Sequence, residues 1–338
     1  MTTRPPRLAG DALSDLVRRV WGLETSVEEL GGWEDDNFRL RADDGRFFVL
    51  KIAPDTVDRA TLANQAALLD HLAASTLAPL APRVVPTRTG GPLHRIEASA
   101  GTRRWARLLT YLAGQPLAGV VDRPPGLLDA IGRRLAELDL VLGSFDHPGT
   151  RRTHEWDVMA APKLTHMTVD IRSADRRMLV TDCLDRFAAT VTPRRDELAH
   201  GVIHADANDH NLLLTHVDGR PRLNGIIDFG DALWAPVVVE LAVCLAYLML
   251  DREDPLADAG AVVRGYHDVR PLTVLERRLL PDLVLGRVCS SVLHAAHGSV
   301  SDPDNDYLQI SAAPMWRLLA WFTSHRDDVS RTVEAACS

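Results

Sequence analysis

Four polar residues near the middle of the chain have the types and spacing that phosphoryl transfer requires. His204, Asp206 and Asn211 follow an apolar run in the order His-x-Asp-x-x-x-x-Asn, and Asp228 opens an Asp-Phe-Gly triplet 17 residues after Asn211. In such an arrangement one carboxylate accepts the proton of an attacking hydroxyl, while an amide and a second carboxylate hold Mg²⁺ on the phosphates. We therefore predict that Asp206 is the general base and that Asn211 and Asp228 are metal ligands.

The residues beside these groups have predicted supporting roles. His204 is expected to brace the catalytic loop through hydrogen bonds, and Gly230 to let the chain turn directly after Asp228. Taken singly, either motif also fits a polar β-turn, because Asp, Asn and Gly are typical turn residues. Their order and separation, each after an apolar run, favour the phosphotransfer interpretation.

A lysine inside an apolar strand is predicted to bind the phosphates of a nucleotide. Lys51 lies in the run FFVLKI, which follows the hairpin dipeptide Asp44-Gly45. A kinase lysine in such a strand reaches the α- and β-phosphates, whereas the alternative is a lysine on the strand surface. Upstream, the backbone N–H groups of Gly31 and Gly32 could approach phosphate oxygens. The pair forms neither a full GxGxxG nor a Walker A motif.

The elements that must position these groups change in type along the chain. Apolar spacing predicts helices over 11–20 and 61–73, and a strand over 103–112 that ends in a Gly- and Pro-containing turn. The remainder is mostly helical, apart from the two strands that lead into the catalytic motifs. We place the domain boundary at the turn, with residues 1–112 binding the nucleotide phosphates and residues 113–338 carrying the catalytic, metal and acceptor groups.

Composition narrows the class of protein. The chain is 46% hydrophobic and 25% charged, as in globular proteins, and its net charge of −8 argues against a nucleic-acid partner. The N-terminus has no apolar signal segment and the four cysteines are widely spaced, so we expect a cytoplasmic protein with reduced thiols. The apolar run 235–250 is too short for a membrane span. We expect a buried helix there, with Glu240 bonded to the catalytic-loop backbone.

The sequence resembles the aminoglycoside phosphotransferase and choline kinase-like superfamily. Within it, the likeness is greatest to the hydroxylysine kinase branch and to the phosphotransferase module fused to class III aminotransferases. The segments that carry the likeness span most of the chain: GGWEDDNFRLR, VLKI, NQAALLDHLA, RLLTYLAGQPL, VIHADANDHNLL, IIDFGDA, GYHDVRPLT, RVCSSV and DNDYLQISAAPMW. The resemblance implies an α+β, bilobal protein-kinase-like fold. Its N-lobe would be a five-stranded antiparallel sheet with one main helix, and its C-lobe would be mostly helical.

The resemblance also implies how the nucleotide binds. Adenine would hydrogen-bond the backbone between Thr110 and Leu112, although these residues could equally be the polar end of a strand. Gln65 stands where many kinases place a glutamate, so it would hydrogen-bond Lys51 without neutralising it. Ala205 stands where aminoglycoside kinases usually carry glycine. We expect ATP as the phosphoryl donor, with GTP as the alternative.

The acceptor site is predicted from residues near the catalytic motifs and near the C-terminus. Asp209 and Asp231 would face the acceptor, and two carboxylates suit an ammonium-bearing alcohol; the alternative is that they cap turns. Asn305 and Tyr307 are further candidates. Arg287 could bind the α-carboxylate of an amino acid or could form an ion pair on a helix surface.

Together these features predict a Mg²⁺-dependent kinase that phosphorylates the hydroxyl of a hydroxy-amino acid or amino alcohol, hydroxylysine-like. An aminoglycoside or other cationic antibiotic is the alternative acceptor. In either case the partner is a cationic or zwitterionic small molecule, with no nucleic acid or membrane involved. The alternative from another class is a pseudokinase that binds nucleotide without turnover. Its support is Gln65 and the incomplete glycine motif.

Overall fold

The computed structural model describes residues 10–32, 35–97, 103–301 and 310–338. The chain divides into two compact units, Met1–Ala113 and Gly114–Ser338. The division falls one residue after the boundary predicted from the sequence.

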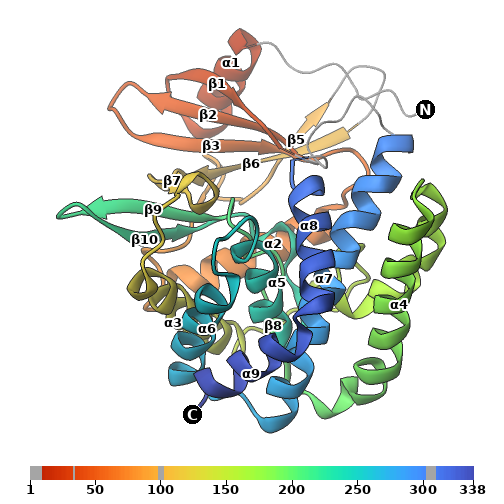
Figure 1. The fold of residues 1–338 in the computed structure, drawn as a ribbon. Coiled ribbons are helices and arrows are strands. Elements are labelled where there is room, and N and C mark those ends of the chain that lie inside the picture. The colour runs from red at the N-terminus through yellow and green to blue at the C-terminus, as the bar shows by residue number, and fades with distance from the viewer. Residues whose placement is uncertain (1–9, 33–34, 98–102, 302–309) are drawn as a thin grey trace. The chain divides into compact units, whose positions relative to one another are not determined.

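An antiparallel sheet forms the centre of the N-terminal unit (Figure 1). The strand order is β1-β2-β3-β6-β4, and β5 also pairs with β6. The described elements of this unit, in chain order, are α1 (Gly10–Trp21), β1 (Thr25–Leu30), β2 (Asp36–Ala42), β3 (Phe47–Ile52), α2 (Arg59–Ala73), β4 (Val84–Val85), β5 (His94–Glu97) and β6 (Arg103–Thr110).

This sheet has six strands, so the expectation of five is wrong. Strands β4 and β5 both pair with the edge of β6 that faces away from β3: Val84 is opposite Leu109, and His94 is opposite Ala106. Pro86 and Pro92 lie between the two short strands. Proline cannot donate a ladder hydrogen bond, and the two prolines lie where the pairing with β6 is interrupted.

Helix α1 and the β2–β3 hairpin agree with the elements predicted from the sequence. The indole Nε1 of Trp21, at the end of α1, donates to the carbonyl oxygen of Val85 at 3.0 Å. In the turn between β2 and β3, Gly45 has a φ of +84°, which glycine adopts without steric cost. The apolar face of α1 joins the core of the sheet through four buried residues: Leu13, Leu16, Val17 and Trp21.

The C-terminal unit is mainly helical, with two small antiparallel sheets of order β10-β9-β7 and β11-β8 (Figure 1). Its described strands are β7 (Gln115–Pro116), β8 (His200–Ile203), β9 (Leu212–Val217), β10 (Arg220–Ile226) and β11 (Leu233–Pro236). Its described α-helices are α3 (Pro125–Leu142), α4 (Ala174–Thr190), α5 (Val238–Leu248), α6 (Pro255–Val269), α7 (Val274–Ser301), α8 (Ala312–Ser324) and α9 (Arg326–Ala336). Short 3₁₀ segments are η2 (Leu117–Gly119), η3 (Pro148–Thr150), η4 (Val158–Asp170), η5 (Thr192–Glu197) and η6 (Phe229–Asp231).

Two buried helices carry side chains to the catalytic motifs. Every residue of α5 is buried, including Glu240, which confirms the buried helix predicted from the apolar run. Helix α7 is the one helix in the described part of the chain that is long and apolar enough to cross a membrane. Its most apolar stretch is 94% buried inside the structure, as in the core helix of a globular fold.

Helices α3 and α6 cross in direct backbone contact at two glycines. A Cβ built on Gly132 of α3 would lie 2.1 Å from the carbonyl oxygen of Val262. A Cβ built on Gly265 of α6 would lie 2.0 Å from the carbonyl oxygen of Asp129. No side chain fits at either distance, so the two helices can approach this closely only because both positions are glycine.

Candidate active site

The catalytic loop, residues 204–211, connects β8 to β9 and is braced by its own histidine. Nδ1 of His204 accepts the N–H of Asp206 at 3.1 Å, and Nε2 lies 2.9 Å from the carbonyl oxygen of Ile227. Because Nδ1 accepts, the neutral ring carries its proton on Nε2 and donates it to Ile227. Burial lowers the pKa of His204, which favours this neutral form. His204 is fully buried, and its two hydrogen bonds link the catalytic loop to Ile227, the residue after β10.

Glu240 of α5 holds the next residue of the loop. Its Oε2 accepts the N–H of Ala205 at 3.0 Å, and the side chain is fully buried, as its sequence context predicted. Burial raises the pKa of Glu240 to about 7, and the hydrogen bonds from the loop backbone act in the opposite direction. Ala205 itself has a φ of +66°, in the left-handed region. An alanine thus occupies a conformation that glycine adopts at lower cost.

We expect the variant Ala205→Gly to be as stable as the wild type or more stable by up to about 1 kcal/mol. The left-handed conformation costs alanine about 1–2 kcal/mol, and the extra freedom of glycine in the unfolded chain offsets about 0.4–1 kcal/mol of that gain. Thermal unfolding checks this result. The matched control is Ala207→Gly in the same loop, where φ is not positive and the methyl group is fully buried. Equal losses of stability in the two variants would show that the positive φ of Ala205 carries no strain.

The carboxylate of Asp206 is held by three donors. Its Oδ1 accepts from Nη2 of Arg287 at 2.8 Å. Its Oδ2 accepts from Nδ2 of Asn208 at 3.0 Å and from Nδ2 of Asn211 at 2.8 Å. Burial raises the pKa of Asp206 to about 8, and the Arg287 guanidinium acts against that rise. The side chain is still 19% exposed, so an acceptor hydroxyl can reach it.

Asn211 and Asp228 have the donor chemistry of a site for a hard divalent cation. Nδ2 of Asn211 donates both to Oδ2 of Asp206 and to its backbone carbonyl, at 2.8 and 2.9 Å, so the amide oxygen is the end that can bind a cation. The N–H of Ile227 donates to the Asn211 carbonyl at 3.0 Å, which ties the loop to the residue before Asp228. Amide and carboxylate oxygens are the ligands that such ions prefer.

The turn at Asp228 differs from the predicted one. Asp228 itself is left-handed, with φ 63° and ψ 69°, and η6 follows directly. Gly230 lies inside η6 and has no positive φ. The chain therefore turns at the aspartate, because Asp tolerates the left-handed region better than most residues.

A segment that the sequence did not single out, residues 152–156, contacts the turn after Asp228. Nη2 of Arg152 donates to the carbonyl oxygen of Gly230 at 2.6 Å. Nε2 of His154 lies 3.4 Å from Oδ1 of Asp231. Burial lowers the pKa of His154 to about 4, so its ring is neutral and the cations that act on Asp231 are Arg152 and Arg287. The signal available in the sequence was a polar and aromatic stretch, Arg-Arg-Thr-His-Glu-Trp, outside any helical pattern.

The remaining acceptor candidates have different surroundings. Asp209 is 8% exposed and its Oδ2 lies 4.0 Å from Nη2 of Arg123, a pairing that favours a structural role. Arg287 is 2% exposed, so the alternative of an ion pair on a helix surface is wrong. Asn305 and Tyr307 lie outside the described residues.

In the N-terminal unit, Lys51 is buried and belongs to a charge cluster. Its Nζ lies 3.3 Å from Oδ2 of Asp35, which also accepts from Nη2 of Arg107 at 2.7 Å. Lys51 is 8% exposed, so the alternative of a lysine on the strand surface is wrong. Sequence reasoning missed Asp35 and Arg107. Arg107 is a charged residue between two apolar pairs of β6, Trp105-Ala106 and Leu108-Leu109, a weaker form of the signal that marked Lys51.

The other predicted nucleotide residues lie near the same strands. Gly31 and Gly32 precede β2, and Nδ2 of Asn37 donates to the Gly31 carbonyl at 3.3 Å. A Cβ on Gly32 would lie 2.1 Å from that same Nδ2, so Gly32 is required for this contact. Gln65 lies on α2 and is half-buried.

The proposed adenine-binding backbone is only partly available. The N–H of Thr110 donates to the Arg83 carbonyl at 2.9 Å, and its hydroxyl accepts the Arg83 N–H at 2.8 Å. The N–H of Tyr111 donates to the Phe47 carbonyl. Within the described residues the N–H of Leu112 has no such partner. Of the backbone predicted to bind adenine, only the N–H of Leu112 is therefore open to such a contact within the described residues.

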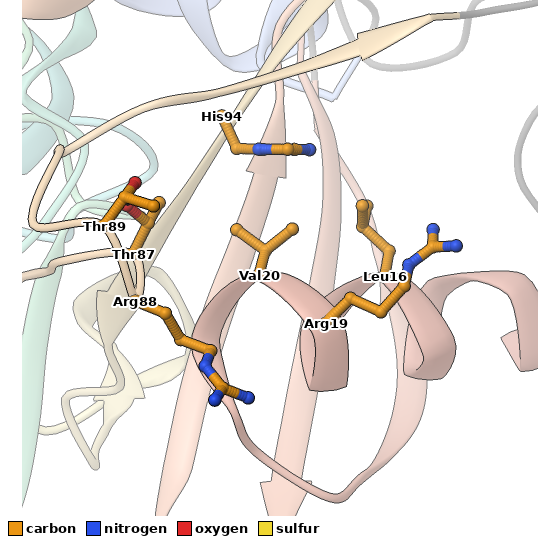
Figure 2. Close-up of a pocket in the computed structure, with 7 residues that line it drawn as sticks. All are labelled: Leu16, Arg19, Val20, Thr87, Arg88, Thr89 and His94. Carbon is orange, nitrogen blue, oxygen red and sulfur yellow. The ribbon is translucent and has the colours of Figure 1, made fainter.

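The N-terminal unit also has a hollow of about 360 Å³ beside α1. Figure 2 shows the guanidinium groups of Arg19 and Arg88 extending in different directions, with the ring of His94 across from α1. The cations do not converge on one point, which argues against a single anion site. Its lining residues are Leu16, Arg19, Val20, Thr87, Arg88, Thr89 and His94.

Comparison with known proteins decides the family. The model of the phosphotransferase enzyme family matches residues 26–278. The chain is 31% identical over 341 residues to the hydroxylysine kinase of Danio rerio. The match covers 96% of this chain and 95% of that protein. The chain belongs to the phosphotransferase enzyme family. The superfamily predicted from the motifs, and the likeness to hydroxylysine kinases, are confirmed.

Two solved phosphotransferase structures have the same fold. One is amicoumacin kinase hAmiN in complex with AMP-PNP, Ca²⁺ and Ami, with a TM-score of 0.70, 15% identity and coverage of 95% of this chain and 94% of that one. The other is the microcompartment-associated aminopropanol kinase, with a TM-score of 0.70, 19% identity and coverage of 91% and 94%. The predicted α+β, protein-kinase-like fold is confirmed.

As a member of this family, the protein is an ATP-dependent kinase that acts on a hydroxyl group of a small molecule. This outweighs Gln65 and the incomplete glycine motif, the two features that supported a pseudokinase, because the family match extends over both units and the chain has all of the predicted catalytic residues: Lys51, Asp206, Asn211 and Asp228.

Proposed function

We propose that this kinase transfers the γ-phosphoryl group of Mg²⁺-bound ATP to the hydroxyl of a hydroxy-amino acid or amino alcohol. The observation that carries the proposal is the carboxylate of Asp206, which is fixed by three donors and is still exposed. It hydrogen-bonds Asn211 and lies close enough to Asp228 for the two carboxylates to interact, and the oxygens of these residues would hold the metal ion. The choice of 5-hydroxylysine as first acceptor is supported by the 31% identity to a hydroxylysine kinase over nearly the whole chain.

In the proposed mechanism, Asp206 accepts the proton of the acceptor hydroxyl while that oxygen bonds to the γ-phosphorus and the bond to ADP breaks. The amide oxygen of Asn211 and the carboxylate of Asp228 would hold Mg²⁺, which neutralises phosphate charge when bound. Lys51 of the N-terminal unit would bind the α- and β-phosphates. The N–H of Leu112 would bind adenine.

The acceptor is proposed to carry an ammonium group, and Asp231 is the side chain that would bind it. Asp231 follows the metal-binding turn, and its side chain is 27% exposed. Burial and the nearby Asp228 raise the pKa of Asp231, so a bound cation would stabilise its ionised form. The neighbouring His154 is neutral and does not compete with the ammonium group.

The test is ADP release from Mg²⁺-ATP with 5-hydroxylysine, homoserine, ethanolamine, choline and several aminoglycosides. We expect saturable turnover on a hydroxy-amino acid or amino alcohol, and loss of the Mg²⁺ response in the variant Asp228→Asn. Turnover on aminoglycosides alone would keep the mechanism and overturn the acceptor class. No turnover on any acceptor, together with no slow ATP hydrolysis, would overturn the proposed function.

A further inference from the structure

A buried arginine contacts the catalytic carboxylate from a distant part of the chain. Arg287 lies on α7, 81 residues after Asp206, and is 2% exposed. Its Nη2 donates to Oδ1 of Asp206 at 2.8 Å and to the hydroxyl of Tyr247 at 3.1 Å. Its Nη1 lies 3.5 Å from the carbonyl oxygen of Trp156. Three segments therefore meet at one guanidinium: the catalytic loop, helix α5 and the segment before η4.

The guanidinium is held in place by aromatic rings on both α5 and the 152–156 segment. Its central carbon lies 4.8 Å from the ring centroid of Trp156 and 5.3 Å from that of Tyr247. The backbone beneath it is equally fixed, because a Cβ on Gly286 would lie 2.6 Å from the ring of Phe187 on α4. Close packing of this kind restricts the movement of the arginine side chain.

This environment does not suit a substrate carboxylate. A bidentate grip needs two N–H groups on one edge of the guanidinium, both open to the incoming ligand. Nη2 already donates to Asp206 and to Tyr247, and only 2% of Arg287 is exposed. Nε is buried and has no hydrogen-bond partner in the described part of the chain. A carboxylate from solvent would have to displace the bond to Asp206 before it could bind.

We propose that Arg287 is a positioning residue that fixes the orientation of Asp206 for proton transfer. This proposal rests on the proposed function, in which Asp206 receives the hydroxyl proton. Arg287 holds Oδ1 while Asn208 and Asn211 hold Oδ2, so the carboxylate plane is set by donors on both sides. Misplacement of a reacting group by about 1 Å is enough to cost about 10²-fold in rate. Arg287 therefore acts on the reaction through Asp206 and does not contact the acceptor.

The test is a double-mutant cycle with Arg287→Met and Asp206→Asn, followed by steady-state and single-turnover kinetics. We expect Arg287→Met alone to lower kcat about 10²-fold while the KM for ATP changes less than about threefold. In the Asp206→Asn background, adding Arg287→Met should change the residual rate less than about threefold, because the group it positions is already gone. If the losses of the two single variants, expressed as activation free energies, add up in the double variant, the proposal is overturned, because Arg287 would then act independently of Asp206.

A pair of acceptors separates this role from carboxylate binding. We expect Arg287→Met to lower kcat by the same factor for 5-hydroxylysine and for 1-amino-2-propanol, which has no carboxylate. A raised KM for 5-hydroxylysine alone, with kcat retained, would instead make Arg287 a substrate ligand. If the variant Asp206→Asn retains the full kcat, the proposed function is wrong. That result comes from the single variant and does not depend on the role of Arg287.

Two milder variants keep the proposal testable if Arg287→Met does not fold. Arg287→Lys keeps the charge and should recover part of the lost kcat, because one N–H can still reach Asp206. Tyr247→Phe removes the hydroxyl that holds Nη2 and should lower kcat about tenfold with no further loss in the Asp206→Asn background. A Tyr247→Phe enzyme with unchanged kcat, together with an Arg287→Lys enzyme of full activity, would overturn the proposal.

Discussion

The variant Asp206→Asn is expected to lose about 10²–10⁴-fold in kcat, the range in which a general base contributes to catalysis. Asparagine matches the shape of aspartate but cannot take up the hydroxyl proton. Its amide oxygen can accept from Arg287, or from Asn208 and Asn211, but not from both sides. The KM for ATP should change little, since the predicted phosphate ligand Lys51 is untouched. Steady-state kinetics with the best acceptor of the panel provides the measurement.

The matched control is Asp251→Asn, which makes the same chemical change far from the catalytic loop. Asp251 forms an exposed ion pair with Arg317 at 2.7 Å, and it also has a positive φ of 52°, which asparagine tolerates. We expect this variant to keep wild-type kcat. A kcat for Asp206→Asn within about threefold of the wild type would assign the base role to another group.

The variant Gly265→Ala is expected to lower the stability of the C-terminal unit by about 2 kcal/mol. The added Cβ would lie 2.0 Å from the carbonyl oxygen of Asp129 and 2.9 Å from its Cα. Both atoms belong to the backbone of α3, so no side-chain rotation can relieve the clash. Overpacking of this kind costs about 3 kcal/mol at the upper end of its range, and the better helix propensity of alanine offsets about 1 kcal/mol. Thermal unfolding should show a Tm lower by about 4–8 °C.

Gly126 provides the control for this substitution. It lies in the first turn of α3, and a Cβ there would meet nothing within 4 Å. Gly126→Ala should therefore leave the Tm unchanged or raise it slightly. A Tm for Gly265→Ala equal to that of Gly126→Ala would mean that α3 and α6 can separate without loss.

The residues that the sequence singled out are those marked by a local signal, either a motif spacing or a charge inside an apolar run. Asp206 and Asn211 lie five residues apart and hydrogen-bond each other directly, so their spacing in the sequence is also their spacing in the loop. Lys51 was identified because it interrupts an apolar strand, and the structure indeed buries it. Glu240 was identified by the same rule, and its bond to Ala205 follows from the cost of burying a charge alone.

Pairs that depend on packing were not predictable. Arg287 was noted only as a candidate substrate ligand, because nothing near it in the sequence indicates that α7 passes beneath the catalytic loop. The pairing of Lys51 with Asp35 needs the position of the loop before β2, which no periodicity encodes. The backbone conformation was also not predictable: the left-handed residue at the turn before η6 is Asp228 and not Gly230.

The sequence by itself determined the catalytic motifs, the family and two of the buried charges, Lys51 and Glu240, because each of these is encoded within a few consecutive residues. Only the tertiary structure decided what surrounds them: the guanidinium of Arg287 on Asp206, the 152–156 segment on the turn after Asp228, and the glycine contact between α3 and α6. The physical reason is that such contacts join residues far apart in the chain. They form only when many apolar faces pack at once, and their geometry is set by that packing as a whole.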